Sequence, residues 1–196
     1  MTHKDIEALR DDIVIQAVLR GQPVTLHSTW GLFSPKEVDE GTRLLIEHLP
    51  IRPDDDCLDL GCGYGPVGIA MAREAARGTT LMVDKDFVAV RYALANARRN
   101  GLSNVDAQLS NGVADIDPAR RFDLVAANLP AKVGRELLTI FVHDAHARLN
   151  PGGRMAVVAI SQLRPVIERA FMAAFGNAEK IKQGRRYVVM GAVNAG

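Results

Sequence analysis

The feature that most restricts how this chain can fold is one glycine-rich run, Asp59-Leu60-Gly61-Cys62-Gly63-Tyr64-Gly65. Apolar residues precede it from Cys57, and Pro66 follows it, a residue that favours the first position of a helix. Glycine-rich turns between a buried strand and a helix are typical of nucleotide-binding α/β domains. The run therefore predicts a Rossmann-like domain whose ligand lies at the carboxyl end of the first strand.

Strand-like and helix-like stretches alternate from Asp56 onward, a pattern that predicts a parallel sheet with helices on both faces. The expected strands are residues 57–60, 79–83, 105–109, 122–127 and 154–160, and the expected helices are residues 66–77, 88–100, 134–149 and 163–175. Two more stretches, 178–183 and 186–192, flank Gly184 and predict an antiparallel hairpin. The expected fold is thus α/β and Rossmann-like, a mostly parallel seven-stranded sheet with a C-terminal antiparallel hairpin, as in class I methyltransferases.

The first 50 residues are expected to extend the sheet domain of residues 51–196. Residues 5–19 predict an amphipathic helix, residues 23–33 a strand or extended segment, and residues 42–49 a helix ended by Pro50. So short a segment cannot bury a core of its own. We therefore expect it to pack on the main domain as a lid or platform.

Composition and charge favour an ordinary soluble domain. The formal net charge is +1, whereas a dedicated nucleic-acid binder more often carries a strong basic excess. No apolar run reaches the roughly 20 residues of a membrane helix, and the N-terminal residues lack the layout of a signal peptide. We expect a cytoplasmic protein without a membrane partner, and we assume a monomer.

The cysteines and histidines do not predict a metal site. Cys57 and Cys62 lie in or just after the first expected strand, a spacing that argues against a disulfide, and two cysteines are too few for structural zinc. His143 and His146 share an expected helix but lack a third ligand. We expect no metal.

Two cofactor classes compete for the glycine-rich run. Gly63-x-Gly65-x-x-Gly68 matches the dinucleotide fingerprint, with Asp84 about 20 residues further on. A dinucleotide places a pyrophosphate at the helix N-terminus, and the carboxylate of Asp59 at the strand end opposes that charge. S-adenosyl-L-methionine carries cationic sulfonium and ammonium groups and no phosphate, so a nearby acid favours it. We predict S-adenosyl-L-methionine as the cofactor.

The glycine loop and the strand-end acids supply the expected cofactor contacts. Asp59 and the glycines Gly61, Gly63 and Gly65 are predicted to lie around the methionine and ribose parts, because glycine lets the backbone approach a ligand closely. Asp84 is predicted to accept from the ribose hydroxyls, and Asn111 to bond the adenine amino group. The alternatives are a purely structural turn and solvated loop side chains.

The fourth expected strand ends in Asn128-Leu129-Pro130, at the edge where open α/β sheets bind ligands. An exocyclic amine on a nucleobase is a poor nucleophile because its lone pair is delocalised into the ring. A site that accepts hydrogen bonds from both N–H groups reorients that lone pair toward the methyl group. The Asn128 side-chain carbonyl is predicted to accept one bond, and the Leu129 backbone carbonyl, held extended by Pro130, the other. Simple turn chemistry is the alternative.

These motifs together resemble the methyltransferase small-domain family, which includes enzymes that methylate guanine N2 in ribosomal RNA. The resemblance covers about residues 25–187 and rests on the segment 31–42, with Phe33 and Asp39-x-Gly41-Thr42, on the loop 58–65 and on residues 128–130. It implies that Asn128, Leu129 and Pro130 receive the flipped amino-bearing base.

The chain departs from the family pattern at two positions. The family usually has Asn-Pro-Pro followed by a large apolar or aromatic residue, whereas this chain has Leu129 and Ala131. A flipped base gains stacking energy from such a side chain, and Ala131 offers little. Trp30, Phe33 or Tyr64 are the alternatives for that role, with core or cofactor packing as the competing explanation.

The leading hypothesis is an S-adenosylmethionine-dependent methyltransferase that modifies an exocyclic amine of an RNA base, of the guanine N2 type, in rRNA or tRNA. A small-molecule or protein methyltransferase on the same fold is the second hypothesis. A non-catalytic protein that binds S-adenosylmethionine or NAD is the third.

Overall fold

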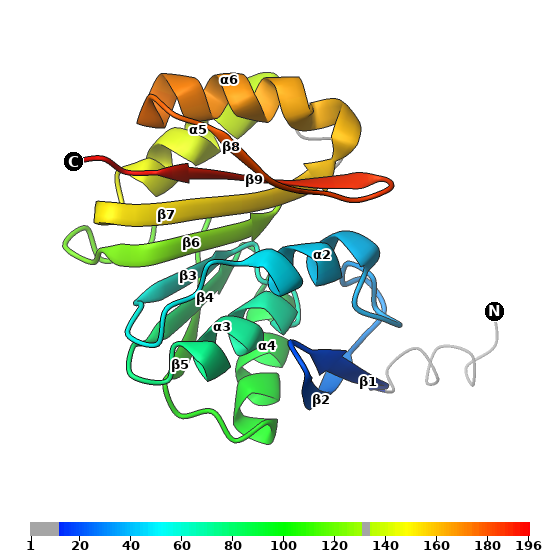
Figure 1. Cartoon of the computed structure of the whole chain (residues 1–196). Helices are drawn as coiled ribbons and strands as arrows, with labels where there is room; N and C mark the ends of the chain where they lie inside the picture. Colours follow the sequence, from blue (N-terminus) through cyan, green and yellow to red (C-terminus); the bar gives the residue numbers. More distant parts are fainter. Residues whose placement is uncertain (1–11, 131–133) are drawn as a thin grey trace.

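A computed structural model describes residues 12–130 and 134–196 of the chain (Figure 1). Its main sheet has seven strands in the order β5-β4-β3-β6-β7-β9-β8. The strands are β3 (Cys57–Leu60), β4 (Thr80–Asp84), β5 (Val105–Leu109), β6 (Phe122–Asn128), β7 (Leu149–Ile160), β8 (Glu179–Gln183) and β9 (Tyr187–Val193). Strands β3 to β7 pair in parallel, and β9 and β8 pair antiparallel at one edge. The predicted fold is confirmed.

Helices cover both faces of this sheet, as Figure 1 shows. They are α2 (Glu40–His48), α3 (Pro66–Glu74), α4 (Phe87–Arg99), α5 (Arg135–His146) and α6 (Arg164–Phe175), with a 3-10 turn, η1 (Ser161–Leu163), before α6. One apolar core contains side chains of α2, α3 and α4, and the other contains those of α5 and α6. Neighbouring residues of β3 alternate between them: Cys57 enters the first core, and Leu58 the second. This explains why the parallel strands are apolar on both faces.

An antiparallel hairpin precedes the sheet domain, and here one sequence prediction is wrong. Residues 13–19 form β1 (Ile13–Leu19), which pairs with β2 (Gln22–Ser28), in place of the helix expected for residues 5–19. Residues 5–11 lie outside the described residues. The β-branched residues of β1 favour a strand, and the two-residue turn Arg20-Gly21 has φ of 48° and 77°, as a hairpin turn requires.

The hairpin is held on helix α4 by two asparagines one helical turn apart. Asn96 donates to the carbonyl of His27 and accepts from its N–H, both at 2.8 Å. Asn100 does the same for Thr25, at 2.8 and 3.2 Å. The polar edge of β2 is therefore paired by side chains, as a neighbouring strand would pair it.

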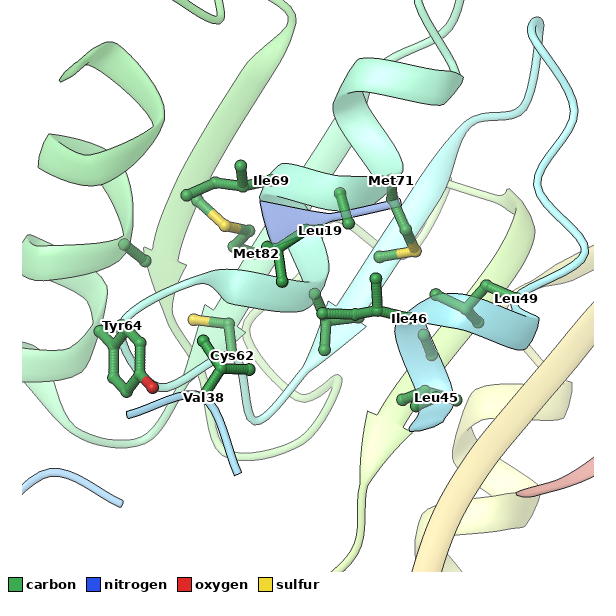
Figure 2. Close-up of a cluster of buried hydrophobic side chains, with 14 of the residues drawn as sticks. Leu19, Val38, Leu45, Ile46, Leu49, Cys62, Tyr64, Ile69, Met71 and Met82 are labelled. Atoms are coloured by element: carbon green, nitrogen blue, oxygen red, sulfur yellow. The ribbon is translucent and has the colours of Figure 1, made fainter. Parts of the chain in front are cut away.

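The hairpin and α2 also share one apolar cluster with the sheet domain (Figure 2). Figure 2 shows Leu19 of β1 and Ile46 of α2 beside Ile69 and Met71 of α3. These side chains are at most 4% exposed. We propose a domain boundary near residue 50, with residues 12–49 packed as a platform on one face of the sheet.

The connection between α5 and β7 also differs from the sequence prediction. The helix expected to reach Leu149 ends at His146, and Leu149 pairs with Phe122 of β6. The pairing shifts register before Arg154, which pairs with Leu124. Residues 150–153 thus form a bulge at the start of β7. The N–H of Gly152 donates to the carbonyl of Asn194, and the N–H of Asn194 donates to the carbonyl of Gly153.

Within the described residues, no helix is both long and apolar enough to cross a membrane. Cys57 and Cys62 are both free and buried, and burial raises the pKa of the Cys57 thiol to about 12. Neither thiol is therefore set up as a nucleophile, in agreement with a packing role.

Candidate cofactor and substrate site

The glycine-rich loop leaves the carboxyl end of β3 and folds back over the end of β4. The N–H groups of Gly61 and Cys62 both donate to the carbonyl of Val83, at 2.9 and 3.0 Å. Gly61, Gly63 and Gly65 have φ of 74°, 55° and 95°, values that favour glycine. Apart from the glycine itself and its two chain neighbours, no atom lies within 4 Å of the position of an added Cβ at Gly61 or Gly63, so a ligand can reach this backbone.

Asp84 ends β4 and binds the loop through its side chain. One carboxylate oxygen accepts from the N–H of Gly63 at 3.0 Å, and the other from the N–H of Asp86 at 3.0 Å. Each carboxylate oxygen has two acceptor positions. The half-buried carboxylate can thus brace the loop and still accept from a ligand hydroxyl.

Asp59 has a different environment from the one expected. Its side chain is 1% exposed, and one oxygen accepts from the backbone N–H of Gly68 at 2.8 Å. Burial, together with the negative charge of Asp84, raises the pKa of Asp59 from 3.8 to about 7, against the opposing effect of the Gly68 hydrogen bond. Asp59 therefore lies beneath the loop, and its influence on a ligand is through charge rather than an exposed contact.

These contacts distinguish the two cofactor classes. A pyrophosphate at the start of α3 needs free N–H groups of the first turn. Pro66 has no N–H, and the Gly68 N–H is already bound by Asp59. The carboxylate of Asp84 also disfavours a phosphate there. An open glycine backbone flanked by acids fits the cationic S-adenosyl-L-methionine and its ribose.

Asn111 lies in the loop that follows β5, beside the end of β4. The preceding Ser110 is 2% exposed, and its N–H donates to the carbonyl of Asp84 at 2.9 Å. The backbone N–H of Asn111 donates to Asp115, while its side chain is exposed. The loops after three adjacent strands are thus hydrogen-bonded together, with Asn111 at the outer one.

Asn128 ends β6, next to the strand that carries the glycine loop. In the parallel pairing of β3 and β6, Leu60 is the partner of Ala127. Asn128 and Gly61 are the residues that follow this pair, so the asparagine and the loop leave the sheet side by side. The topology therefore joins the predicted cofactor and substrate residues at one edge.

The Asn128 amide is bound by residues far away in the sequence. Its Nδ2 donates to Oδ2 of Asp39 at 3.2 Å and to Oγ1 of Thr42 at 2.9 Å. Asp39 is the N-cap of α2 and also accepts from the N–H groups of Gly41 and Thr42. The Asp39-x-Gly41-Thr42 motif contributes to the family resemblance, but its sequence alone predicted no contact with Asn128. The cap pattern followed by apolar residues was the available signal.

The other two residues of the motif occupy different environments. Leu129 is 5% exposed and belongs to the core on the α5 and α6 face, and its N–H donates to Val158 at 2.9 Å. Pro130 is exposed. Ala131, where the family usually has a larger residue, lies outside the described residues. The Leu129 side chain thus packs into the core, which leaves only its backbone for a substrate contact.

The three aromatic candidates for stacking on a base are not equivalent. Tyr64 is 3% exposed, and its hydroxyl donates to the carbonyls of Ser34 and Glu37 at 3.3 and 2.9 Å, which ties the glycine loop to the segment before α2. Phe33 and Trp30 of that segment are 66% and 46% exposed. Burial and these hydrogen bonds make Tyr64 a packing residue, while the other two rings are available at the surface.

Comparison with known proteins shows one family. The model of the methyltransferase small domain matches residues 23–191. An uncharacterized protein of Bacillus subtilis, YbxB, is 34% identical over 142 residues, which are 71% of this chain and 70% of YbxB. Ribosomal RNA large subunit methyltransferase G of Streptomyces avermitilis is 32% identical over 181 residues, 89% of this chain and 46% of that protein.

A solved structure is similar over almost the whole chain. The Thermus thermophilus 16S rRNA N2 G1207 methyltransferase RsmC, in complex with AdoMet and guanosine, superposes with a TM-score of 0.81. It is 26% identical, and the match covers 93% of this chain and 50% of that one. The chain therefore spans about half the length of the ribosomal RNA methyltransferases that it matches.

Proposed function

Because the chain belongs to the methyltransferase small-domain family, we propose that it transfers a methyl group from S-adenosyl-L-methionine to an exocyclic amine of a ribosomal RNA base, of the guanine N2 type. The observation that carries this proposal is the Asn128 amide, bound through its nitrogen beside the glycine loop. Relatives that act on ribosomal RNA support the substrate class.

The bound cofactor supplies a methyl group activated by a positively charged sulfur. Gly61 and Gly63 offer it an open backbone, and Asp84 accepts from its ribose hydroxyls. The Asp59 side chain, ionised above its pKa of about 7, would stabilise the positive charge from beneath the loop. These residues would hold the cofactor beside the end of β6, where the amine is proposed to bind.

Asn128 and Leu129 act on the amine. The Asn128 Oδ1 and the Leu129 carbonyl accept one hydrogen bond each from the amine N–H groups, which directs the nitrogen lone pair at the methyl carbon. The amine nitrogen would form the new N–C bond as the C–S bond of the bound cofactor breaks. The electron pair of the C–S bond would stay on sulfur. The amine then loses a proton to water. Positioning supplies most of the rate, so no strong general base is needed.

The test is methyl transfer from labelled cofactor to unmodified ribosomal RNA, transcribed in vitro, followed by nucleoside analysis. The intact chain should produce N2-methylguanosine, and Asn128→Ala should lose the product while it binds the cofactor with unchanged affinity. Asn177→Ala is a matched control. This asparagine binds Val193, which pairs with the start of β7 at the strand ends away from Asn128.

Three results would contradict the proposal. Label found only in a protein extract or a metabolite pool favours the small-molecule or protein hypothesis. Full activity of Asn128→Ala removes the proposed role of the motif. A thermal shift with NAD alone, and none with S-adenosyl-L-methionine, would overturn the cofactor assignment.

A further inference from the structure

We propose that Asp39 and Thr42 are positioning residues that hold the Asn128 amide in the one orientation that presents its oxygen to the substrate amine. This inference rests on the proposed function and deepens it. It gives the first turn of α2 and its N-cap Asp39 a role in orienting the proposed catalytic residue.

The hydrogen bonds admit a single orientation of the amide. Both carboxylate oxygens of Asp39 already accept hydrogen bonds, from the Gly41 N–H and from the Thr42 hydroxyl, so Asp39 faces Asn128 as an acceptor. The Thr42 hydroxyl donates its only proton to Asp39 Oδ2, so toward Asn128 it can only accept. Both neighbours of the amide are therefore acceptors, and the Nδ2 group must face them. A flipped amide would place Oδ1 against two oxygens, which electrostatic repulsion disfavours.

The same contacts strengthen the oxygen as an acceptor. Hydrogen bonds to an ionised group are stronger than those between neutral groups. A carboxylate bound to the amide nitrogen shifts electron density toward the amide oxygen, as in other chains of polarised hydrogen bonds. Oδ1 of Asn128 thereby becomes a better partner for the N–H of an amine whose lone pair must be released.

The positioning pair is itself held rigidly. Asp39 Oδ1 accepts from the Gly41 N–H at 2.9 Å, and Thr42 is 5% exposed. Helix α2 packs on β6, β7 and β9, and its residues Leu45 and Ile46 are at most 1% exposed. The amide of Asn128 is thus fixed by a helix start that the core holds against the sheet.

Conservative variants separate positioning from folding. Asp39→Asn keeps a residue that caps helices as well as aspartate does, but it loses the charge and introduces an N–H donor next to the Asn128 amide. Thr42→Val keeps the shape and loses the hydroxyl, and Thr42→Ser restores the hydroxyl. Glu40→Gln is the matched control, the same acid-to-amide change one residue from Asp39 on an exposed side chain.

With ribosomal RNA as substrate, we expect Asp39→Asn and Thr42→Val to lower kcat by about 100-fold, the effect of misplacing a reacting group. The KM for the cofactor and the melting temperature should change little. Thr42→Ser should recover most of kcat, and Glu40→Gln should match the unchanged chain.

A second measurement needs neither cofactor nor RNA. The side-chain amide protons of Asn128, assigned in the NMR spectrum from their loss in Asn128→Ala, should exchange slowly with water. Asp39→Asn should shift their resonances and speed their exchange, whereas Glu40→Gln should leave both unchanged.

The outcomes distinguish this inference from the proposed function. If Asn128→Ala is inactive while Asp39→Asn and Thr42→Val keep full kcat, the positioning role is wrong and the proposed function stands. If Asn128→Ala is fully active, the proposed role of Asn128 fails first. If Asp39→Asn and Thr42→Val lower the melting temperature as well as kcat, the pair is a structural cap only. That result would overturn the inference.

Discussion

The carboxylate of Asp59 accepts a hydrogen bond of 2.8 Å from the backbone N–H of Gly68, in the first turn of the helix that the glycine loop begins. This bond occupies a donor that a phosphate would need, and it places a buried acid beneath the cofactor loop. The preference for a cationic cofactor over a dinucleotide therefore follows from how the loop is built as well as from its composition.

The buried acid makes a prediction about stability and pH. Because the pKa of Asp59 is raised from 3.8 to about 7, the folded chain holds a proton that the unfolded chain releases between these values. The contribution of this residue to the free energy of unfolding should fall as pH rises from about 4 to 7. Asp59→Asn should lack this loss, measured by urea unfolding at several pH values. An exposed control, Asp54→Asn, should keep the wild-type slope, and an identical slope in Asp59→Asn would contradict the assignment.

Asp84 should control cofactor affinity. Asp84→Ala removes the acceptor proposed for the ribose hydroxyls and the hydrogen bond to the Gly63 N–H. Hydrogen bonds to charged groups contribute about 1.5–3 kcal/mol, so the Kd for S-adenosyl-L-methionine should rise by at least about 10-fold in calorimetric titration. Asp106→Ala, which changes an exposed acid of β5, is the control. An unchanged Kd in Asp84→Ala would exclude the ribose contact.

Phe33 should contribute to RNA binding. Its ring is 66% exposed, and Trp30 nearby has the Lys36 ammonium 4.8 Å from its ring centre. Exposed aromatic rings with a cation nearby are typical of sites on which bases stack, worth about 1–3 kcal/mol per base. Phe33→Ala should weaken binding of ribosomal RNA in filter-binding assays by about fivefold or more. Met172→Ala, an exposed apolar residue of α6, should not.

Asn96 should be important for the stability of the hairpin and the loop. It is fully buried and, besides both bonds to His27, it donates to the carbonyl of Tyr64 at 2.9 Å. Asn96→Ala leaves the buried carbonyl of Tyr64 and two part-buried backbone groups of His27 without this partner, and an unpaired buried group costs about 1–3 kcal/mol. We expect a loss of about 3 kcal/mol in chemical unfolding, larger than that of the half-buried Asn100→Ala. Equal losses would show that the bond to Tyr64 contributes nothing.

The ion pair between Arg154 and Asp55 is buried and lies at the end of the sheet away from Asn128, near the starts of β3 and β6. Arg154→Met leaves an uncompensated buried carboxylate and should cost about 3–5 kcal/mol of unfolding free energy. Adding Asp55→Asn should recover part of the loss. Methyl transfer per folded molecule should stay as in the unchanged chain, because the pair is far from the end of β6. A double variant no more stable than Arg154→Met would argue against pairing as the cause.

Most of the sheet was predictable because each strand carries its own signal. Strands β3 and β5 begin and end where the apolar pattern places them, and the glycine loop marks the turn between β3 and α3. The helix expected over residues 5–19 is wrong in its described part, where residues 13–19 form β1, and the reason is local. The apolar residues of this stretch are compatible with helical spacing, but its β-branched run and the turn Arg20-Gly21 favour a hairpin.

The site was predictable in its residues and less so in its contacts. Strand-end positions brought Asp84 and Asn128 to the same edge of the sheet, as parallel topology requires. The burial of Asp59 against Gly68 did not follow from the loop pattern, since it depends on how closely α3 packs on β3. Tyr64 likewise became a packing residue only because the segment before α2 folds over it.

The sequence of strands and helices along the chain, the glycine loop and the family motifs are each encoded locally. They appear in short stretches of sequence with a regular apolar period or a required glycine. The partners of Asn128 are of another kind. Asp39 and Thr42 lie 89 and 86 positions away, and they meet the asparagine because α2 packs against the sheet with its first turn at the end of β6. Hydrogen bonds between such distant residues depend on tertiary packing, which no local pattern encodes. What orients the proposed catalytic amide was therefore decided by the tertiary structure.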